Sequence, residues 1–437
     1  MLDIKFIREN PEEIKKVINL KNIKLDIDEL LSLDSQRGQL LISLESLRAE
    51  RNQNATYMKK AGKPEQEVIE KGRELKQLIQ EKEDQLKQIE ESLETLMALV
   101  PMIPSEDTPI GKDESGNIEV RRWNKKPEAG PPSFDFNIKD HIELGQDLNL
   151  LDLERGVKAS GFRGYYLKNE GALMHLALMR YAIDKMLKYG FTLLIPPTLV
   201  RGEVLFGSGH FPFDTDNIYV VDSLSHTKQD TDQKQKYLVG TSEPSLLYYH
   251  ANEILDEAAL PIKFVGFSQC YRSEIGSYGK DTKGIYRIHE FMKVEQVLVC
   301  KNDKAEAEKW HQTMLKYAEE FLQELELSYR VIQMCTGDMG PGKYKMYDVE
   351  TWMPSRNSYG ETHSASNLLD WQTRRLNLKV KGTDGKKYYP YALNNTVVAS
   401  PRILIAIWEN YQQKDGSIRI PTVLQPYMGI DSIKRSD

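Results

Sequence analysis

The stretch CYRSEIGSYGKDTKGIYRIHEFMKVEQ, from Cys270 to Gln296, carries the clearest structural signal in this chain. Apolar and polar residues alternate on both sides of a central segment, IGSYGKDTKG, that holds three glycines. A period of two is typical of β-strands, because successive side chains of a strand point to opposite faces. We therefore predict two strands, over 263–274 and 286–299, that pair as a hairpin around a long loop.

Many charged side chains of this hairpin fall on one face. The alternation places there Arg272, Glu274, Arg287, His289, Phe291, Lys293 and Glu295. Burying unpaired charge costs on the order of several kcal/mol, so this face should either bind a charged ligand or form its own ion pairs. A salt-bridged, exposed sheet surface is the alternative. No GxGxxG turn follows a strand and no GxxxxGK[ST] loop occurs, so any nucleotide would bind to arginines on an antiparallel sheet.

Two later segments carry polar residues suited to a ligand site. Glu361 and Ser364 lie three residues apart, and their oxygens are ligands that Mg²⁺ accepts, although a polar turn would look the same. Asn394 and Thr396 follow on a predicted strand. Arg402 then begins an apolar helix, where a cation opposes the helix dipole. This placement indicates either function or an ion pair.

The first hundred residues have a different pattern. Leucines recur at steps of three and four from Leu30 to Leu47, and apolar residues do so again from Val68 to Val100. A repeat of about 3.5 residues keeps one helical seam facing a partner helix. The segment KKAGKPEQ interrupts the repeat with glycine and proline. We therefore predict two long helices that form an antiparallel coiled-coil hairpin.

The tip of this predicted hairpin is basic. Between residues 48 and 63 the only acid is Glu50, and the basic residues are Arg48, Arg51, Lys59, Lys60 and Lys63. Such a cluster is either a solvated helix end or a surface for a nucleic-acid backbone, whose phosphates release counterions when they are neutralised.

Composition sets broad limits. The chain has 437 residues, with 40% hydrophobic and 28% charged residues and a net charge of −6. It has 3 cysteines, no signal-peptide core and no long apolar run, which favours a soluble cytoplasmic protein without a membrane span. Prolines and glycines between residues 101 and 116 mark a linker. We place the domain boundary there, so that residues 1–110 form the domain with the coiled-coil arm and residues 111–437 form a second domain.

Together these motifs resemble those of bacterial seryl-tRNA synthetases, which are class II aminoacyl-tRNA synthetases. The hairpin is similar to the second class II signature, and NNTVVASPRILIAIWENYQ is similar to the third. The segments TSE, ETHSASN and IPTVLQPYMG match seryl-specific ones, and the basic-tipped hairpin matches the arm that grips serine tRNA. The resemblance implies an α+β fold, with a coiled-coil arm before an antiparallel sheet flanked by helices.

The resemblance also implies roles for individual residues. The ATP-binding residues would be Arg272, Glu274, Arg287, Phe291, Glu361, Ser364 and Arg402. Among them Arg272 would hold the α-phosphate, Glu274 and Phe291 the adenine, and Arg402 the γ-phosphate. Arg272 and Arg402 would act as the catalytic residues, and Glu361 with Ser364 would hold Mg²⁺.

The serine site implied by the resemblance comprises Thr241, Glu243, Arg272, Glu295, Asn394 and Thr396. Thr241 and Glu243 would line the side of the amino group, and Glu295 with Thr396 would bind the hydroxyl. The implied reaction activates L-serine with ATP and transfers the seryl group to the terminal adenosine of serine tRNA. Whether selenocysteine tRNA is charged as well stays open. The tRNA-binding residues would be those of the basic tip.

A homodimer is also expected from the resemblance. The segment ALMHLALMRYAIDKMLKYG, residues 172–190, predicts an amphipathic helix, and FTLLIPPTL after it predicts a strand that ends at Pro196. This helix and strand are similar to the dimer-forming segment of the family. The chain departs from the family pattern at three positions, Pro244, Gly360 and His363. None of them has a role in the implied chemistry.

Two other functions would fit parts of this pattern. A paralogue that loads an amino acid onto a carrier should lack the basic arm, which this chain has. A non-catalytic coiled-coil partner protein should have lost Arg272, Glu274, Arg402 or the pair Glu361 and Ser364, and all of them are present.

Overall fold

A computed structural model describes residues 1–60, 65–222, 235–275 and 283–435 of the chain. The chain divides into two compact units, Met1–Pro101 and Met102–Asp437, which we describe separately. This division falls ahead of the expected domain boundary between residues 110 and 111.

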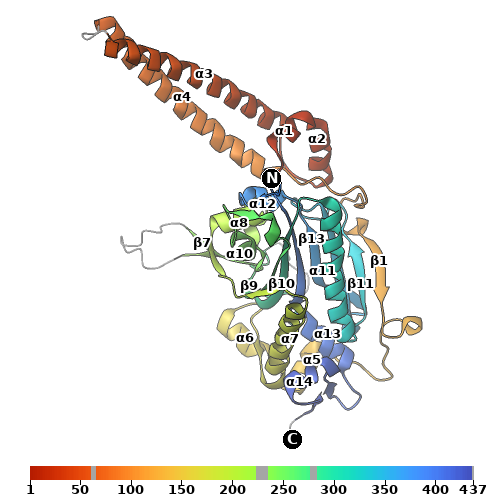
Figure 1. Cartoon of the computed structure of the whole chain (residues 1–437). Helices are drawn as coiled ribbons and strands as arrows, with labels where there is room; N and C mark the ends of the chain where they lie inside the picture. The colour runs from red at the N-terminus through yellow and green to blue at the C-terminus, as the bar shows by residue number, and fades with distance from the viewer. Residues whose placement is uncertain (61–64, 223–234, 276–282, 436–437) are drawn as a thin grey trace. The chain divides into compact units, whose positions relative to one another are not determined.

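The first unit is helical, and two of its helices are long (Figure 1). Its elements are α1 (Ile4–Glu9), α2 (Pro11–Leu20), α3 (Ile27–Lys60) and α4 (Gln66–Leu99). The residues that α3 and α4 bury include Leu30, Leu44, Leu75, Ile79 and Leu93, which all belong to the predicted seam. The coiled-coil hairpin is therefore confirmed, although the break that we placed in KKAGKPEQ falls on 61–64, outside the described residues.

The second unit is built on an eight-stranded sheet. In spatial order its strands are β1 (Ile118–Trp123), β11 (Tyr329–Gln333), β12 (Lys345–Met353), β13 (Ser358–Asn367), β16 (Tyr391–Ala399), β10 (Glu290–Cys300), β9 (Ile262–Tyr271) and β4 (Thr192–Leu194). Neighbouring strands pair antiparallel, except that the edge strand β4 runs parallel to β9. The predicted antiparallel sheet is confirmed.

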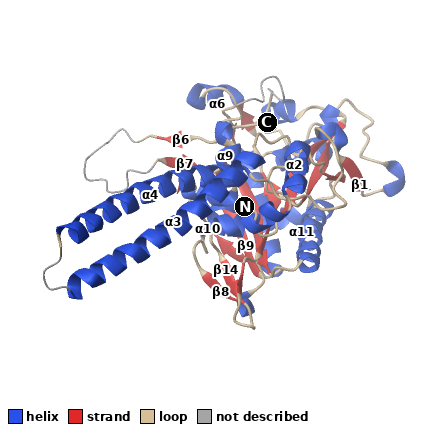
Figure 2. Ribbon diagram, turned by 90° about the horizontal axis from the view of Figure 1, so that it is seen from above, coloured by secondary structure: helices blue, strands red, loops and turns tan. Residues whose placement is uncertain are grey.

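Helices pack against this sheet and complete the core (Figure 2). Helix α7 (Asn169–Lys188) contacts β9 and β10, α11 (Lys304–Glu324) contacts β13 and β16, and α13 (Arg402–Tyr411) contacts β12. Large side chains such as Trp408 and Phe321 are fully buried between these layers. Helix α7 matches the helix predicted over 172–190, and β4 matches the strand predicted after it.

Shorter elements surround the central sheet. The helices are α5 (His141–Asp147), α6 (Leu153–Ser160), α8 (Gly202–Ser208), α9 (His210–Phe213), α10 (Glu243–Tyr248), α12 (Trp371–Arg375) and α14 (Gln425–Met428). The strands are β2 (Leu151–Asp152), β3 (Tyr166–Leu167), β5 (Leu199–Arg201), β6 (Val220–Val221), β7 (Lys236–Leu238), β8 (Ile254–Asp256), β14 (Lys379–Lys381), β15 (Lys387–Tyr388), β17 (Ile418–Arg419) and β18 (Ser432–Ile433). Within the described ranges, no helix has the length and apolar character needed to cross a bilayer.

The strands β9 and β10 form the predicted hairpin, but both are shorter than expected at the loop end. Strand β9 ends at Tyr271, so Arg272 and Glu274 lie beyond it, and β10 begins at Glu290, after Arg287 and His289. The assignment of these four residues to one strand face was therefore wrong. Glu274 has a φ of 53°, a left-handed conformation that ends the alternation of an extended strand. Loop residues 276–282 lie outside the described part of the chain.

Candidate active site

A cavity opens where the hairpin, β13 and the start of α13 meet. The predicted ATP-binding residues all line it, namely Arg272, Glu274, Arg287, Phe291, Glu361, Ser364 and Arg402. Tyr286, Lys293, Thr362 and Thr396 also belong to its wall. Residues separated by more than a hundred positions in sequence therefore surround one space, which we call the first cavity.

Arg402 is the first residue of α13, and its guanidinium is fixed in the wall of the first cavity. Its Nε donates to the carbonyl of Tyr286 at 3.1 Å, and Nη1 donates to the carbonyl of Glu361 at 3.0 Å. Nη1 also pairs with Glu361 Oε2 at 3.2 Å. These acceptors compensate for the unfavourable position of a cation at a helix N-terminus. The ion pair that the sequence left open is therefore present.

Two arginines, Arg402 and Arg272, act on the charge of Glu361. Desolvation alone would raise the pKa of this carboxyl, but the nearby guanidinium groups of Arg402 and Arg272 outweigh it and lower the pKa. Glu361 is thus an anion at neutral pH. Its side chain is 48% exposed, so the carboxylate remains accessible from the cavity.

The hairpin residues form the opposite part of the first cavity. Arg287 Nη1 pairs with Glu274 Oε2 at 2.9 Å, and the Arg272 guanidinium lies over the Phe291 ring, 5.4 Å from its centroid. Such pairs hold the charged groups in defined orientations without a bound ligand. Although the strands end early, the loop ends still direct these side chains into the same space.

A second cavity adjoins the first. The predicted serine-binding residues Thr241, Glu243, Arg272, Glu295, Asn394 and Thr396 all line it. The two cavities share Arg272, Lys293, Ser364 and Thr396 in their walls. A ligand in one cavity would therefore meet a ligand in the other along these four residues.

Lys293 connects the polar groups between the two cavities. Its Nζ donates to Thr241 Oγ1 at 3.1 Å and pairs with Glu295 Oε2 at 2.5 Å. Thr396 Oγ1 donates to the same carboxylate at 3.4 Å. Glu295 is only 2% exposed, and this burial raises its pKa, an effect that Lys293 partly offsets. The sequence placed Lys293 on this face but did not assign it a role.

Glu243 is held at the far side of the second cavity. It begins α10, and its Oε1 accepts from Asn394 Nδ2 at 2.7 Å and from Gln372 Nε2 at 2.6 Å. A carboxylate at a helix N-terminus also interacts favourably with the helix dipole. Pro244 lies in the first turn of α10, where proline is well tolerated. Gln372 comes from a distant helix, and no sequence signal identified it.

The expected Mg²⁺ residues lie next to a buried acid that the sequence analysis missed. Asp348 on β12 pairs with Ser364 on β13 in the strand register, and its Oδ1 is buried without a hydrogen-bond partner. Burial, and then the charge of Glu361, raise the pKa of Asp348 well above its usual range. Glu361 and Ser364 carry oxygen donors of the kind that Mg²⁺ prefers, and the Asp348 carboxyl is their neighbour on the adjacent strand. Only the β12–β13 register reveals this neighbour.

The structure explains two of the departures from the family pattern, Gly360 and His363, by their packing. A Cβ at Gly360 would lie 2.8 Å from the Tyr286 hydroxyl oxygen, so glycine leaves room for that ring. His363 is fully buried in β13, and its Nε2 donates to the carbonyl of Val397 at 2.9 Å. This hydrogen bond of the His363 ring joins β13 to β16.

The basic tip of the first unit differs from these cavities. Arg51, Lys59 and Lys60 are exposed, whereas Arg48 pairs with Glu83 of α4 at 2.7 Å. Lys63 lies outside the described residues. Three of the predicted tRNA-binding residues thus present solvated charge, and Arg48 also contributes to the pairing of the two helices.

Comparisons with known proteins cover the whole chain. Residues 219–411 match the tRNA synthetase class II core domain (G, H, P, S and T), and residues 1–104 match the seryl-tRNA synthetase N-terminal domain. The chain is 44% identical to the serine–tRNA ligase of Deinococcus radiodurans over 98% of each chain. It is 43% identical to that of Dictyoglomus thermophilum over 99% of each.

Solved structures give the same result. The seryl-tRNA synthetase of Pyrococcus horikoshii, solved with ATP, superposes with a TM-score of 0.89 at 38% identity over the full length of both chains. The cytoplasmic serine–tRNA ligase of Naegleria fowleri, solved with AMP, has a TM-score of 0.85 at 30% identity, covering 100% of this chain and 99% of that one. With full-length identity of this level and both domain models matched, this chain belongs to the seryl-tRNA synthetase family of class II aminoacyl-tRNA synthetases.

Proposed function

We propose that this protein activates L-serine with ATP and transfers the seryl group to the terminal adenosine of serine tRNA. The observation that carries the proposal is the contact between the two cavities. An arginine-lined cavity suited to a nucleoside triphosphate adjoins a second cavity whose polar residues suit an amino acid, and Arg272 and Thr396 belong to both walls. The reacting groups of two substrates would meet there, which lowers the entropic part of the barrier.

In the first step a carboxylate oxygen of serine attacks the α-phosphorus of ATP. The bond from that phosphorus to the bridging oxygen breaks, and pyrophosphate leaves with the electron pair. Arg272 and Arg402 stabilise the charge on the phosphates, with Arg402 directed toward the leaving group. In the second step a ribose hydroxyl of the terminal adenosine attacks the seryl carbonyl, and AMP leaves.

The two substrates would be recognised by different sets of side chains. Phe291 stacks on adenine while Glu274 accepts from its amino group. Glu243 and Thr241 face the serine ammonium, and Glu295 with Thr396 binds the serine hydroxyl. A site that hydrogen-bonds a hydroxyl leaves buried polar groups unpaired when alanine binds, which discriminates against alanine by roughly 10⁴.

Mg²⁺ would enter with ATP and be held by Glu361 and Ser364, with Asp348 behind them. When bound, the ion neutralises phosphate charge. The protein itself supplies the two arginines and the orientation of the serine carboxylate. Glu361 is kept as an anion by those arginines, so it is ready to act as a ligand.

Transfer to tRNA would use the arm of the first unit. Exposed Arg51, Lys59 and Lys60 suit a sugar–phosphate backbone, because the phosphates release their counterions when cationic side chains neutralise them. Buried, unpaired cysteines at Cys270, Cys300 and Cys335 favour a reducing compartment such as the cytoplasm.

A homodimer is the favoured assembly. Apolar side chains that remain solvent-exposed in one chain include Leu173 and Leu176 of α7 and Leu193 and Ile195 in and after β4, with Ile195 at 78% exposure. A stable monomer rarely exposes several large apolar residues close together in sequence. Sedimentation equilibrium should give a molecular mass of two chains. Leu176→Glu should shift this mass toward that of a single chain.

Amino-acid-dependent ATP–pyrophosphate exchange across the twenty amino acids tests the proposal. We expect exchange with serine alone, followed by serine attachment to serine tRNA. Exchange driven by alanine or glycine would favour the carrier-loading paralogue. No exchange from folded protein with Mg²⁺ would favour the non-catalytic coiled-coil partner protein.

A further inference from the structure

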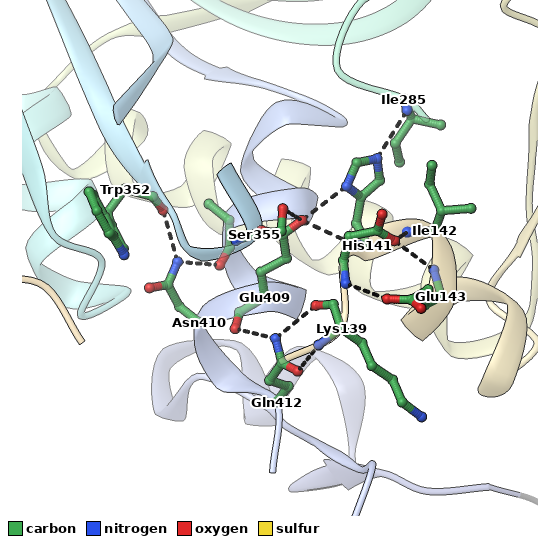
Figure 3. Close-up of polar contacts among 12 residues, drawn as sticks. Lys139, His141, Ile142, Glu143, Ile285, Trp352, Ser355, Glu409, Asn410 and Gln412 are labelled. Atoms are coloured by element: carbon green, nitrogen blue, oxygen red, sulfur yellow. Dashed lines mark hydrogen bonds and ion pairs between the residues drawn. The ribbon is translucent and has the colours of Figure 1, made fainter. Parts of the chain in front are cut away.

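A buried acid joins three segments behind the first cavity. Glu409 of α13 is fully buried, and its Oε1 accepts from the backbone nitrogen and Nδ1 of His141, each at 3.0 Å. Its carboxylate also accepts from Ser355, through the backbone nitrogen at 3.0 Å and Oγ at 2.9 Å (Figure 3). Gln412 adds a second connection, with two hydrogen bonds to the backbone of Lys139. The start of α5 is thus tied to the helix that carries Arg402.

These contacts determine which nitrogen of His141 is free to accept a hydrogen bond. Because Glu409 Oε1 accepts, Nδ1 of His141 carries the proton and Nε2 has a lone pair. The backbone nitrogen of Ile285 donates to Nε2 at 3.3 Å (Figure 3). His141 therefore links the buried acid to the segment that returns from the hairpin loop into β10.

The return segment is confined around His141. Gly284 has a φ of 70°, and a Cβ there would lie 2.0 Å from His141 Nε2, so only glycine fits. The next contact concerns Tyr286, whose carbonyl accepts from Arg402 Nε at 3.1 Å. Two guanidinium groups contact its ring, at centroid distances of 4.5 Å for Arg356 and 4.6 Å for Arg402. Arg356 follows Ser355, which Glu409 holds directly.

We propose that His141 is a positioning residue for the ATP site. It does not line the first cavity. Its hydrogen bond to the Ile285 amide fixes the position of the next residue, Tyr286. The carbonyl and the ring of Tyr286 in turn hold the Arg402 guanidinium in its orientation. The proposal rests on the proposed function, because it assumes that the first cavity binds ATP.

Two substitutions at position 141 separate positioning from general stability. His141→Phe keeps an aromatic ring but loses both hydrogen bonds of the imidazole, whereas His141→Gln retains an acceptor near the position of Nε2. We expect His141→Phe to raise the KM for ATP about tenfold, the effect of one lost hydrogen bond, while the KM for serine changes less than about twofold. His141→Gln should restore most of the ATP affinity. His311→Phe, at another buried histidine that lies outside both cavities, is the matched control and should leave both constants unchanged.

Hydrogen exchange of the Ile285 amide gives a readout that does not need activity. In the substrate-free protein this amide should exchange about tenfold faster in His141→Phe than in the wild type, with His141→Gln closer to the wild type. Unchanged exchange, or an equal rise of the KM for ATP and for serine, would overturn the proposal. If the wild type shows no serine-dependent activity, the proposed function fails separately. In that case, calorimetry of ATP binding in the presence of Mg²⁺ tests the role of His141. Equal dissociation constants for the wild type and His141→Phe, or no binding to either protein, would refute a role of His141 at the ATP site.

Discussion

The catalytic unit and the coiled-coil arm both concentrate positive charge, but they hold it in opposite ways. Arg402 has two backbone acceptors and an ion pair, and its side chain is 18% exposed. Arg51, Lys59 and Lys60 at the end of α3 are exposed side chains. A fixed cation suits a small ligand with defined phosphate geometry, since no ordering is needed when it binds. A solvated cation suits a backbone whose contacts shift along the strand.

The difference predicts separate kinetic effects in the two regions. Changes in the cavities should alter the activation of serine, with weak dependence on salt. Changes at the tip should alter only the tRNA-dependent step, with strong dependence on salt, because exposed charges are screened over about 10 Å at 0.1 M. The predictions below test this separation in order of decreasing effect.

The largest expected effect is that of Arg402→Ala. Loss of a fixed cation facing the phosphates should lower serine-dependent ATP–pyrophosphate exchange about a thousandfold. Arg330→Ala is the matched control, since Arg330 pairs with Glu350 on neighbouring strands away from both cavities, and its exchange should stay within about twofold. If Arg402→Ala keeps a tenth of the activity or more, Arg402 is not a phosphate ligand.

The catalytic unit should also lose stability in acid, because it buries neutral histidines. Burial lowers the pKa of His363 to about 4, and it does the same for His175 and His311. The unfolded histidine, with a pKa near 6.5, takes up its proton first, so stability falls as the pH drops from about 6.5 to about 4 and changes no further below that. Over this pH range each of these histidines lowers the free energy of unfolding by about 3 kcal/mol at most.

Urea unfolding followed by tryptophan fluorescence checks this prediction, because all 5 tryptophans lie in the second unit. His363→Gln should make the pH dependence shallower, because it removes one of the buried neutral rings. Residues 1–101 contain no histidine, so the helical signal of the arm should persist in acid. Equal slopes for the wild type and His363→Gln would show that His363 is not buried in its neutral form.

A smaller effect is expected from Thr396→Val, which removes the hydroxyl that donates to Glu295. The value of kcat/KM for serine should fall about 10- to 100-fold, while the KM for ATP changes little, because one buried carboxylate loses a donor. Thr373→Val is the control, since the Thr373 hydroxyl bonds the carbonyl of Pro390 outside both cavities. An equal rise of the KM for serine and of the KM for ATP would show that Thr396 contributes to packing and not to serine recognition.

The smallest effect concerns the tip. Replacing Arg51, Lys59 and Lys60 together by alanine should raise the KM for tRNA about tenfold near physiological salt and make its salt dependence shallower. Serine-dependent exchange should not change. A control triple at the exposed Lys381, Lys386 and Lys387 should leave the KM for tRNA unchanged. An equal effect of the two triples would indicate nonspecific attraction to the whole protein surface.

Local periodicity was enough to predict much of the fold. The steps of three and four in α3 and α4, the amphipathic pattern of α7 and the alternation in β9 and β10 each depend on neighbours within a few residues. The candidate site residues Arg272, Glu361 and Arg402 were identified because they lie in short segments that resemble the motifs of the family.

Contacts between distant segments could not be predicted in this way. Asp348 meets Ser364 only through the register of β12 and β13, and His141 reaches Ile285 across more than a hundred residues. The left-handed backbone of Glu274, which follows the early end of β9, is likewise not visible in the alternation of the sequence. Such contacts depend on which strands and helices become neighbours in space. The sequence of one segment specifies its own period and polarity, whereas the partner of a buried carboxylate or ring nitrogen is set when the sheet and the helices pack together.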